Sequence, residues 1–221
     1  MKKIMFDDRF GLTQAVLSRR KTQTRRIVPD NTPLGNWSDT VRNSRYQVGE
    51  IVAVAQSYRD AGYSPDKIFY RSIPEVGGYK KELASELRGW ANKMFVGASL
   101  MPHYIRITDV RVERLQDISD KDCVAEGVRA VEVSNNWGNS VTHTEYRVVY
   151  LDKYSREKLL IGMTPREVYA VLIDRIFSKG TWERNPFVFI YDFELLEGGY
   201  DVAYEKPIIY KTNLPNRMCK R

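Results

Sequence analysis

The stretch Phe187-Val188-Phe189-Ile190-Tyr191-Asp192-Phe193 carries the clearest sign of the fold. Aromatic side chains occupy every second position, and Val188 and Ile190 occupy two of the positions between them. Successive side chains of a β-strand point to opposite faces, so both faces of such a strand would be apolar. A strand with two apolar faces is covered on both, and the pattern therefore predicts a central strand of a sheet.

Three further segments predict strands. Ile51 to Ala55 and Ile68 to Tyr70 are short apolar runs, and Tyr104 to Glu113 is rich in β-branched residues. The charges of this last segment fall mostly at alternate positions, so we expect it to be half exposed. The strands are separated by short helical segments without regular βαβ alternation. We therefore predict an α+β fold with a small, curved, barrel-like sheet, mixed or antiparallel, and flanking helices.

Two helices are predicted in the second half of the chain. Ser119 is a capping-box-like start, and Gly127 is placed to end a helix of about two turns, which makes Glu126 its last side chain. Thr164 caps a second helix, which has proline in its first turn and an apolar stripe. This helix is expected to continue until Gly180.

Composition indicates a single elaborated domain. The 221 residues are enough for one buried core, and 43% apolar with 29% charged residues is ordinary for a globular domain. We predict a domain over residues 1–197 with an inserted loop or hairpin at about 129–160 that the core does not need. Residues 198–221 form a basic tail that either wraps the domain or is disordered.

The charge of the chain favours an anionic partner. A formal charge of +7 and a pI near 9.3 fit a nucleic acid or a nucleotide. No apolar run approaches the roughly 18 residues of a membrane span, and Asp7-Asp8 comes too early for a secretory signal, so we expect a cytoplasmic protein. Cys123, Cys219, His103 and His143 lack the spacing of metal or redox motifs. We expect no metal and no cofactor.

The segment Arg19 to Arg26 reads Arg-Arg-Lys-Thr-Gln-Thr-Arg-Arg and is the candidate site. It follows a predicted helix that Asp7 or Asp8 can cap and that is expected to end near Arg19 or Arg20. Arginine offers a planar fork of donors to phosphate, lysine a point charge, and threonine a hydroxyl that can bind an oxyanion or act as a nucleophile. The structural alternative is a solvated basic helix end.

Ordered motifs extend along the chain to about Leu195. They are, in order, Lys21-Thr22-Gln23-Thr24-Arg25-Arg26 after a helix, Tyr46-x-Val48-Gly49, Met101-Pro102, Arg106-Ile107-Thr108, Arg114-Leu115-Gln116-Asp117-Ile118-Ser119, Ala125-Glu126-Gly127 and Trp182-x-x-Asn185-Pro186-Phe187-Val188. Each motif is common alone, and their order makes them specific. Together they resemble the ASCH domain family of the PUA-like superfamily, in its larger, often phage-associated type. The resemblance implies a small β-barrel with flanking helices.

The resemblance implies first a binding module, because PUA-like domains grip RNA or a modified nucleotide in a cleft. Binding through phosphates would weaken steeply with salt, and an aromatic side chain could stack on a base. The candidate contacts are Arg20, Lys21, Thr22, Arg25, Arg26, Arg106 and Trp90. Packing is the alternative role of Trp90, and also of Trp137 in the 129–160 segment.

The resemblance implies an enzyme as the alternative. Some minimal family members carry a Lys, a Thr three residues later and a downstream Glu, and they hydrolyse the amide of N4-acylated cytidines. Lys21, Thr24 and Glu126 occupy the matching positions. Lys21 would activate Thr24 if burial and its arginine neighbours lower its pKa, and Glu126 would pass the proton to the leaving amine. In a regular strand Lys21 and Thr24 would face opposite sides, so we expect a turn or helical residue between them.

The sequence also departs from the family pattern. Gln56 stands where an acid often follows the Val-x-Val strand, Arg20 replaces a common glycine, and the helix after Thr164 lacks the usual tryptophan. Glu126 could instead close its helix or pair with an arginine. A third hypothesis is an interaction component of a phage or mobile-element system, with a protein partner on the basic face.

Overall fold

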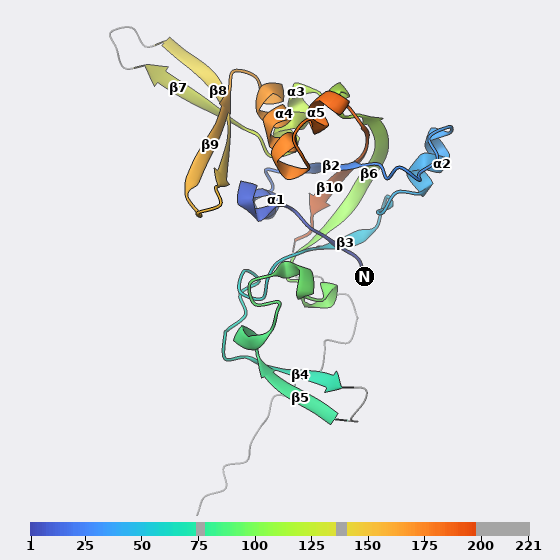
Figure 1. Cartoon of the computed structure of the whole chain (residues 1–221), viewed down its shortest axis with the longest axis vertical. Helices are drawn as coiled ribbons and strands as arrows, with labels where there is room; N and C mark the ends of the chain where they lie inside the picture. Colours follow the sequence, from blue (N-terminus) through green and yellow to red (C-terminus); the bar gives the residue numbers. More distant parts are fainter. Residues whose placement is uncertain (74–77, 136–140, 198–221) are drawn as a thin grey trace, which may run out of the picture.

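The main layer of the molecule is a five-stranded sheet (Figure 1). The computed structural model describes residues 1–73, 78–135 and 141–197. The strand order is β1 (Lys3–Ile4), β3 (Ile51–Val54), β6 (Tyr104–Arg114), β10 (Phe187–Leu195) and β2 (Gln23–Ile27). The β1–β3 pair is parallel and the other pairs are antiparallel. The predicted α+β class and the predicted strands of this sheet are confirmed.

The strand β10 is an interior strand, as its sequence predicts. It is hydrogen-bonded to β6 on one side and to β2 on the other. Val188 and Ile190 are fully buried on one face, and Phe189 and Tyr191 are buried on the other. The neighbouring strand β6 keeps exposed residues along its length, which confirms that it is half exposed.

The five strands do not close into a hydrogen-bonded barrel in the described part of the chain. The two edge strands are β1 and β2. They are linked by a side chain instead, because Arg26 Nη2 donates a hydrogen bond to the Met5 carbonyl oxygen at 2.5 Å. We call the space between these two edges, with the residues that flank it, the seam.

The first predicted helix is shorter than expected. A 3₁₀ turn, η1 (Asp8–Phe10), precedes α1 (Leu12–Leu17), and Gly11 separates them with a φ of 61°. Asp7 caps the 3₁₀ turn by accepting from the backbone N–H of Arg9. The prediction of one helix ending near Arg19 or Arg20 is therefore wrong in extent, because left-handed residues interrupt the chain at Gly11 and at Arg19.

The helices of the second half begin as predicted. Ser119 caps α3 (Asp120–Ala125), which ends at Glu126 and Gly127, and Thr164 caps α4 (Pro165–Ile176). The latter helix stops before Gly180 because Asp174 accepts hydrogen bonds from the backbone N–H groups of Gly180 and Trp182. The chain thereby turns into a further helix, α5 (Thr181–Arg184). The short 3₁₀ turn η5 (Leu115–Asp117) joins β6 to α3.

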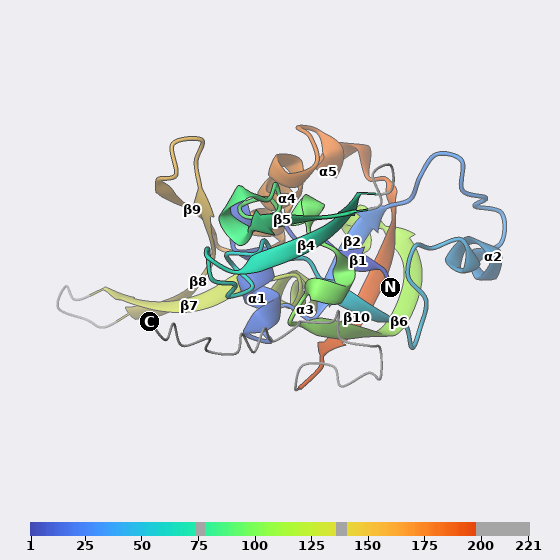
Figure 2. The same cartoon turned by 90° about the horizontal axis from the view of Figure 1, so that it is seen from below.

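The helix α2 (Trp37–Arg42) follows the loop that contains Pro29 and Pro33. Figure 2 shows it on the side of the main sheet opposite the arm that β7 to β9 form. Its Trp37 ring lies 5.2 Å from the ring of Phe187 at the start of β10.

Residues 129–135 and 141–162 contain the three antiparallel strands of a second sheet. These are β7 (Arg129–Asn135), β8 (Val141–Leu151) and β9 (Glu157–Gly162), and they project from the main body (Figure 1). Val148 and Leu160 belong to the main hydrophobic core, whereas Val149 and Leu159 are exposed on the other face. The expected hairpin is present in the antiparallel strands β7 to β9, but the expectation that the core does not need it is wrong. Trp137 lies outside the described residues.

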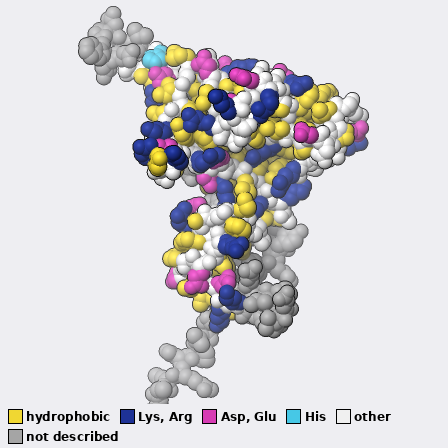
Figure 3. Space-filling view, in the orientation of Figure 1, with side chains coloured by type: hydrophobic (Ala, Val, Ile, Leu, Met, Phe, Trp, Pro, Cys, Tyr) yellow, Lys and Arg dark blue, Asp and Glu magenta, His cyan; other side chains and the backbone are white. Residues whose placement is uncertain are grey.

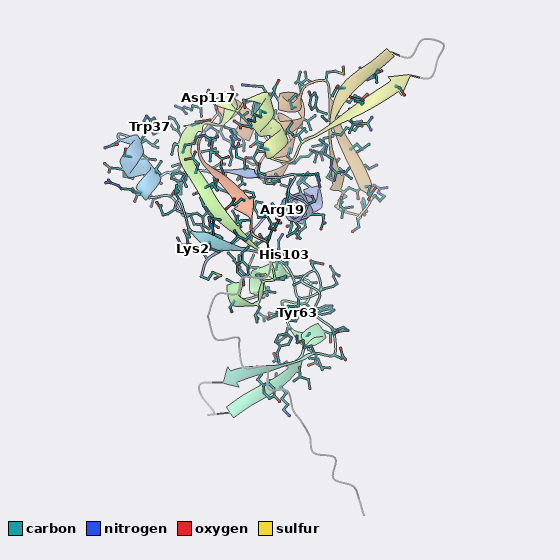
Figure 4. The ribbon with its side chains drawn as sticks, turned by 180° about the vertical axis from the view of Figure 1, so that it is seen from behind. Lys2, Arg19, Trp37, Tyr63, His103 and Asp117 are labelled. Carbon is teal, nitrogen blue, oxygen red and sulfur yellow. The ribbon has the colours of Figure 1, made fainter. Side chains whose placement is uncertain are left out.

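A smaller lobe is built on the hairpin of β4 (Ile68–Ile73) and β5 (Gly78–Leu83). The 3₁₀ turns η2 (Ala84–Glu86), η3 (Lys93–Phe95) and η4 (Ala98–Leu100) complete it, and a separate hydrophobic cluster fills it. Figure 4 labels Tyr63 in this lobe and His103 where the lobe meets the main body. Lys3 fixes the junction, since its Nζ donates to the carbonyl oxygens of Lys93, Met94 and Val96.

The packing of the second sheet predicts opposite effects for two neighbouring valines. Val148→Ala should lower the free energy of unfolding by about 1–2 kcal/mol, because it removes buried methyl groups and leaves a cavity. Val149→Ala is the matched control, and it should change stability little because Val149 is 40% exposed. Denaturant titration of both variants measures the difference. Equal destabilisation would contradict the packing of this face on the core.

Candidate functional site

The basic cluster enters the core immediately after α1. Arg19 takes a φ of 59°, and the backbone N–H groups of Arg20 and Lys21 both donate to the Ala15 carbonyl oxygen at 2.9 Å. The N–H of Thr22 then donates to the carbonyl oxygen of Ala125, at the end of α3. The chain therefore runs from the end of α1 past the end of α3 into the edge strand β2. This path places the Lys21 side chain inside the molecule.

Lys21 is buried and all of its ammonium donors are used. Its Nζ lies 2.5 Å from Glu126 Oε2, 2.8 Å from the Glu126 carbonyl oxygen and 2.8 Å from the Gln23 carbonyl oxygen. The exposed fraction of the side chain is 1% for Lys21 and 6% for Glu126. A charge buried this deeply needs both a counter-ion and hydrogen bonds, and the end of α3 supplies both.

The local sequence explains how Glu126 reaches this position. It is the C-cap of α3, and Gly127 follows with a φ of 115°, a conformation that favours glycine. A Cβ at position 127 would also lie 3.3 Å from Leu12 Cδ2 and 3.9 Å from Lys21 Cδ. The Ala125-Glu126-Gly127 motif thus ends the helix and lets the chain pass close to Lys21.

Arg25 is the second buried cation beside Glu126. Its guanidinium lies 3.4 Å from Glu126 Oε1, 3.4 Å from Asp122 Oδ2 and 4.0 Å from Glu113 Oε2. It also donates to the side-chain oxygen of Gln23. Its Nε is buried and has no hydrogen-bond partner among the described residues. Glu126 is therefore the counter-ion of both Lys21 and Arg25. The more exposed carboxylates of Asp122 and Glu113 also lie near Arg25.

A small cavity lies against these groups. Its volume is about 50 Å³. It is lined by Phe6, Asp7, Leu12, Lys21, Thr24, Arg25, Arg26, Glu126, Tyr169, Leu172, Ile173, Ile176 and Phe177. The structure thus brings Lys21, Thr24 and Glu126, the three predicted catalytic residues, to one enclosed space. We call it the inner cavity.

Thr24 has a free hydroxyl at the inner cavity. The residue is 4% exposed, and its Oγ1 makes no hydrogen bond to any residue in the described part of the chain. The expected turn between Lys21 and Thr24 is not found, because Lys21 and Thr22 are irregular and β2 begins at Gln23. Both side chains nevertheless line the same cavity, since Lys21 precedes the regular strand and does not follow its alternation.

Tyr169 is a site residue that the sequence analysis missed. Its hydroxyl is buried at the inner cavity and has no hydrogen-bond partner of good geometry among the described residues. Burial, followed by the nearby Glu126 carboxylate, raises the pKa of Tyr169 well above its usual value of 10.0, so the phenol is neutral. The sequence carried one signal for it, because Tyr169 lies about one turn before Leu172 of the apolar stripe of α4.

The pKa of Lys21 is lowered from its usual value of 10.5. Burial is the largest cause, because it disfavours the ammonium form, and Arg26 and Arg25 lower the pKa further. Glu126 acts in the opposite direction through its charge and its hydrogen bond, without offsetting the burial. The buried thiol of Cys123 on α3 has its pKa raised to about 12, again mainly by burial, so it is not a nucleophile at neutral pH.

The other predicted contacts are spread over the molecule. Arg20 and Thr22 are exposed beside the cluster, and Arg106 is exposed on β6, where it pairs with Glu194 at 3.3 Å. Trp90 is half-buried against the hydrophobic cluster of the small lobe. Figure 3 shows Lys and Arg side chains dispersed over the main body and the small lobe on this face. The structure brings together Lys21, Thr24, Arg25, Arg26 and Glu126, whereas Arg106 and Trp90 lie elsewhere.

Comparisons with family models, with curated proteins and with solved structures returned no match. Over residues 1–73, 78–135 and 141–197, no group of three or more His, Cys, Asp or Glu side chains could hold a metal ion. The same part of the chain has no helix of the length and apolarity that a membrane crossing requires.

Glu126 pairs with both Lys21 and Arg25, so we predict that substitution of Glu126 and substitution of Lys21 destabilise the protein to different extents. Glu126→Gln should lower the free energy of unfolding by about 3–5 kcal/mol, because it leaves Lys21 and Arg25 without their buried carboxylate. Lys21→Met should cost clearly less, because Arg25 still faces Glu126 at 3.4 Å. Urea titration at pH 7 measures both. Equal costs would show that Arg25 does not balance Glu126.

Proposed function

We propose that this protein hydrolyses the amide that joins an acyl group to the exocyclic amine of a cytidine-type nucleobase. The proposal includes the PUA-like barrel of the ASCH family, with the seam as its closing point, and a cytoplasmic location. The proposal rests on one observation: Thr24, whose hydroxyl has no hydrogen-bond partner among the described residues, lines the same cavity as the buried Lys21–Glu126 pair. A purely structural ion pair has no need of a free hydroxyl beside it.

The chemistry starts from the free amine of Lys21. Burial disfavours the Lys21 ammonium and lowers its pKa, so the amine forms as the ammonium loses its proton to solvent. As Thr24 Oγ1 forms its bond to the carbonyl carbon, the Lys21 amine accepts the hydroxyl proton. Glu126, whose Oε2 lies 2.5 Å from Lys21 Nζ, then passes this proton to the exocyclic nitrogen as the carbon–nitrogen bond breaks. Water hydrolyses the resulting ester and releases Thr24.

The size of the inner cavity limits the acyl group. One water molecule needs about 10–15 Å³ of such a cavity. A cavity of about 50 Å³ therefore admits a group of a few atoms, such as acetyl, and excludes a nucleobase. The base must therefore remain outside this cavity while its acyl group enters.

Tyr169 and Arg25 complete the proposed site. Arg25 Nε and the Tyr169 hydroxyl are buried donors without a hydrogen-bond partner of good geometry among the described residues, and both residues line the inner cavity. Developing negative charge on the acyl oxygen would give these donors a partner, as in an oxyanion site. An unpartnered buried donor costs about 1–3 kcal/mol, which a bound carbonyl oxygen would offset.

Binding without catalysis is the second candidate function. The observation that favours it is the position of Arg26 at the seam, where its guanidinium is partly exposed and has no carboxylate partner in the described chain. Lys21 and Arg25 are buried, so phosphates of an RNA at the surface would have to contact Arg20 and Arg26 instead. Salt dependence of RNA binding tests this candidate.

The decisive test compares two threonines of the same cluster. Wild-type protein should release cytidine from N4-acetylcytidine, and Thr24→Val should lower kcat by about 10³-fold or more, because it removes the nucleophile and keeps the shape. Thr22→Val is the control, because Thr22 is exposed, and it should retain wild-type turnover. Absence of turnover in the wild type at high enzyme concentration, or equal loss in both variants, would contradict the hydrolase.

The pH profile follows from the lowered pKa of Lys21. The reactive form is the free amine, so kcat/KM should rise with pH through the pKa of Lys21 and level off below its usual value of 10.5. Stopped assays across the alkaline range measure this limb, and Lys21→Ala should abolish it along with most turnover. A limb centred at or above 10.5 would show that Lys21 is not the base.

Tyr169→Phe isolates the proposed oxyanion donor. It should lower kcat about 10-fold to 1,000-fold with little change in KM, because the hydrogen bond forms only as charge develops. Thermal unfolding should show equal or greater stability, because the substitution removes an unpartnered buried hydroxyl. A loss of stability with unchanged kcat would assign the hydroxyl to the fold alone.

A further inference from the structure

A second cavity opens at the seam, next to the inner cavity. Its volume is about 370 Å³, which is in the usual range for small-molecule sites. It is lined by Lys3, Met5, Arg26, Ile27, Pro29, Asn43, Arg45, Tyr46, Phe189 and Tyr191. We call it the outer cavity. Arg26 lines both cavities, and its hydrogen bond to the Met5 carbonyl lies between the edge strands.

Three aromatic rings give the outer cavity a firm apolar wall. Tyr46, Phe189 and Tyr191 are each less than 5% exposed. The rings of Tyr46 and Tyr191 lie 5.2 Å apart in an edge-on arrangement, and the Tyr46 hydroxyl donates to the Lys3 carbonyl oxygen at 2.9 Å. Such a wall suits a flat ring or a sugar, because both present apolar faces.

All charged residues that line the outer cavity are basic. Lys3, Arg26 and Arg45 line it and no acidic residue does. Lys3 is already committed to three backbone carbonyl oxygens at the junction with the small lobe. Arg26 and Arg45, by contrast, form no ion pair with any described residue. Arg45 and the remaining donors of Arg26 are therefore available to an anion.

Two other arginines differ from Arg26 and Arg45 in their surroundings. Arg111 on β6 contacts three carboxylates, those of Asp109, Glu113 and Asp192, and Arg25 on β2 also faces three. The fold thus surrounds some of its arginines with acids but leaves Arg26 on β2 and Arg45, in the loop after α2, without them. Arg45 instead extends over the ring of Tyr46, at 5.6 Å from its centroid. Unpaired arginines beside buried rings are the chemistry that recognises a phosphate attached to a ring system.

We propose that the outer cavity binds the ribose phosphate of a pyrimidine nucleotide, with Arg45 and Arg26 on the phosphate. The preferred ligand is thus a nucleotide, either free or as a residue of RNA, and a nucleoside binds more weakly. The choice of base rests on the proposed function, because the shared Arg26 places this cavity beside the one that would take the acyl group. The phosphate contact itself depends only on the cavity and its charges.

Equilibrium binding at low salt tests the proposal with three probes: cytidine, cytidine 5′-monophosphate and a cytidine trinucleotide. Cytidine 5′-monophosphate should bind about 10-fold to 100-fold more tightly than cytidine, because charged hydrogen bonds to phosphate are strong. The trinucleotide distinguishes the two sources of the phosphate. Tighter binding of the trinucleotide than of the monophosphate indicates an RNA residue, and the reverse indicates a free nucleotide.

Arg45→Gln should remove most of the preference for the monophosphate and leave cytidine binding unchanged. Arg42→Gln is the matched control, because Arg42 is an exposed arginine on α2 that pairs with Asp39 and does not line the cavity. Arg45 is itself exposed, so its substitution should leave the melting temperature unchanged. Equal binding of cytidine and its monophosphate, no binding of the monophosphate, or equal losses in the two variants would each overturn the proposal.

Turnover assays on the same preparations separate this inference from the hydrolase. Phosphate-dependent binding without any hydrolysis of an acetylated cytidine would support the outer cavity and reject the enzyme. Hydrolysis of N4-acetylcytidine at the same kcat/KM with and without a 5′-phosphate, unaffected by Arg45→Gln, would support the enzyme and reject the phosphate site.

Discussion

The buried ion pair between Lys21 and Glu126 is the constraint on which the centre of this molecule depends. A lysine ammonium inside a protein requires a counter-ion and acceptors for its protons, and here the end of α3 and the start of β2 provide them. The pair therefore fixes the end of α1, the edge strand β2 and the end of α3 relative to one another. Gly127 is needed at the same point, because the chain must turn sharply beside Lys21.

The same burial also shifts the pKa values of the side chains at the site. Burial lowers the pKa of Lys21 towards the range in which it can act as a base, and it keeps the Tyr169 phenol neutral as a donor. A salt bridge on the surface would have neither effect, because solvent would screen it. Removing water from these side chains thus has two effects: it costs folding free energy, and it shifts their pKa values.

The open edges of the main sheet give the site its shape. Because β1 and β2 are joined through the Arg26 side chain instead of a strand ladder, the space between them accommodates two cavities of different character. The inner cavity is small and lined by groups suited to acyl transfer, and the outer cavity is larger, aromatic and cationic. Arg26 lines both. In our proposals the reacting group and the body of one ligand occupy these two spaces.

The sequence by itself determined the α+β class, the interior strand β10, and the starts of α3 and α4, because alternation, apolar periodicity and caps act over a few residues. The resemblance of its motifs to a known family also singled out Lys21, Thr24 and Glu126. Only the tertiary structure decided that Val148 and Leu160 of the second sheet complete the core, that Tyr169 lines the inner cavity, and that Arg45 and Arg26 line one cavity. These contacts join segments distant in the chain, so no local pattern encodes them. The free arginines of the seam, in particular, differ from their paired neighbours only in which acids the fold brings near.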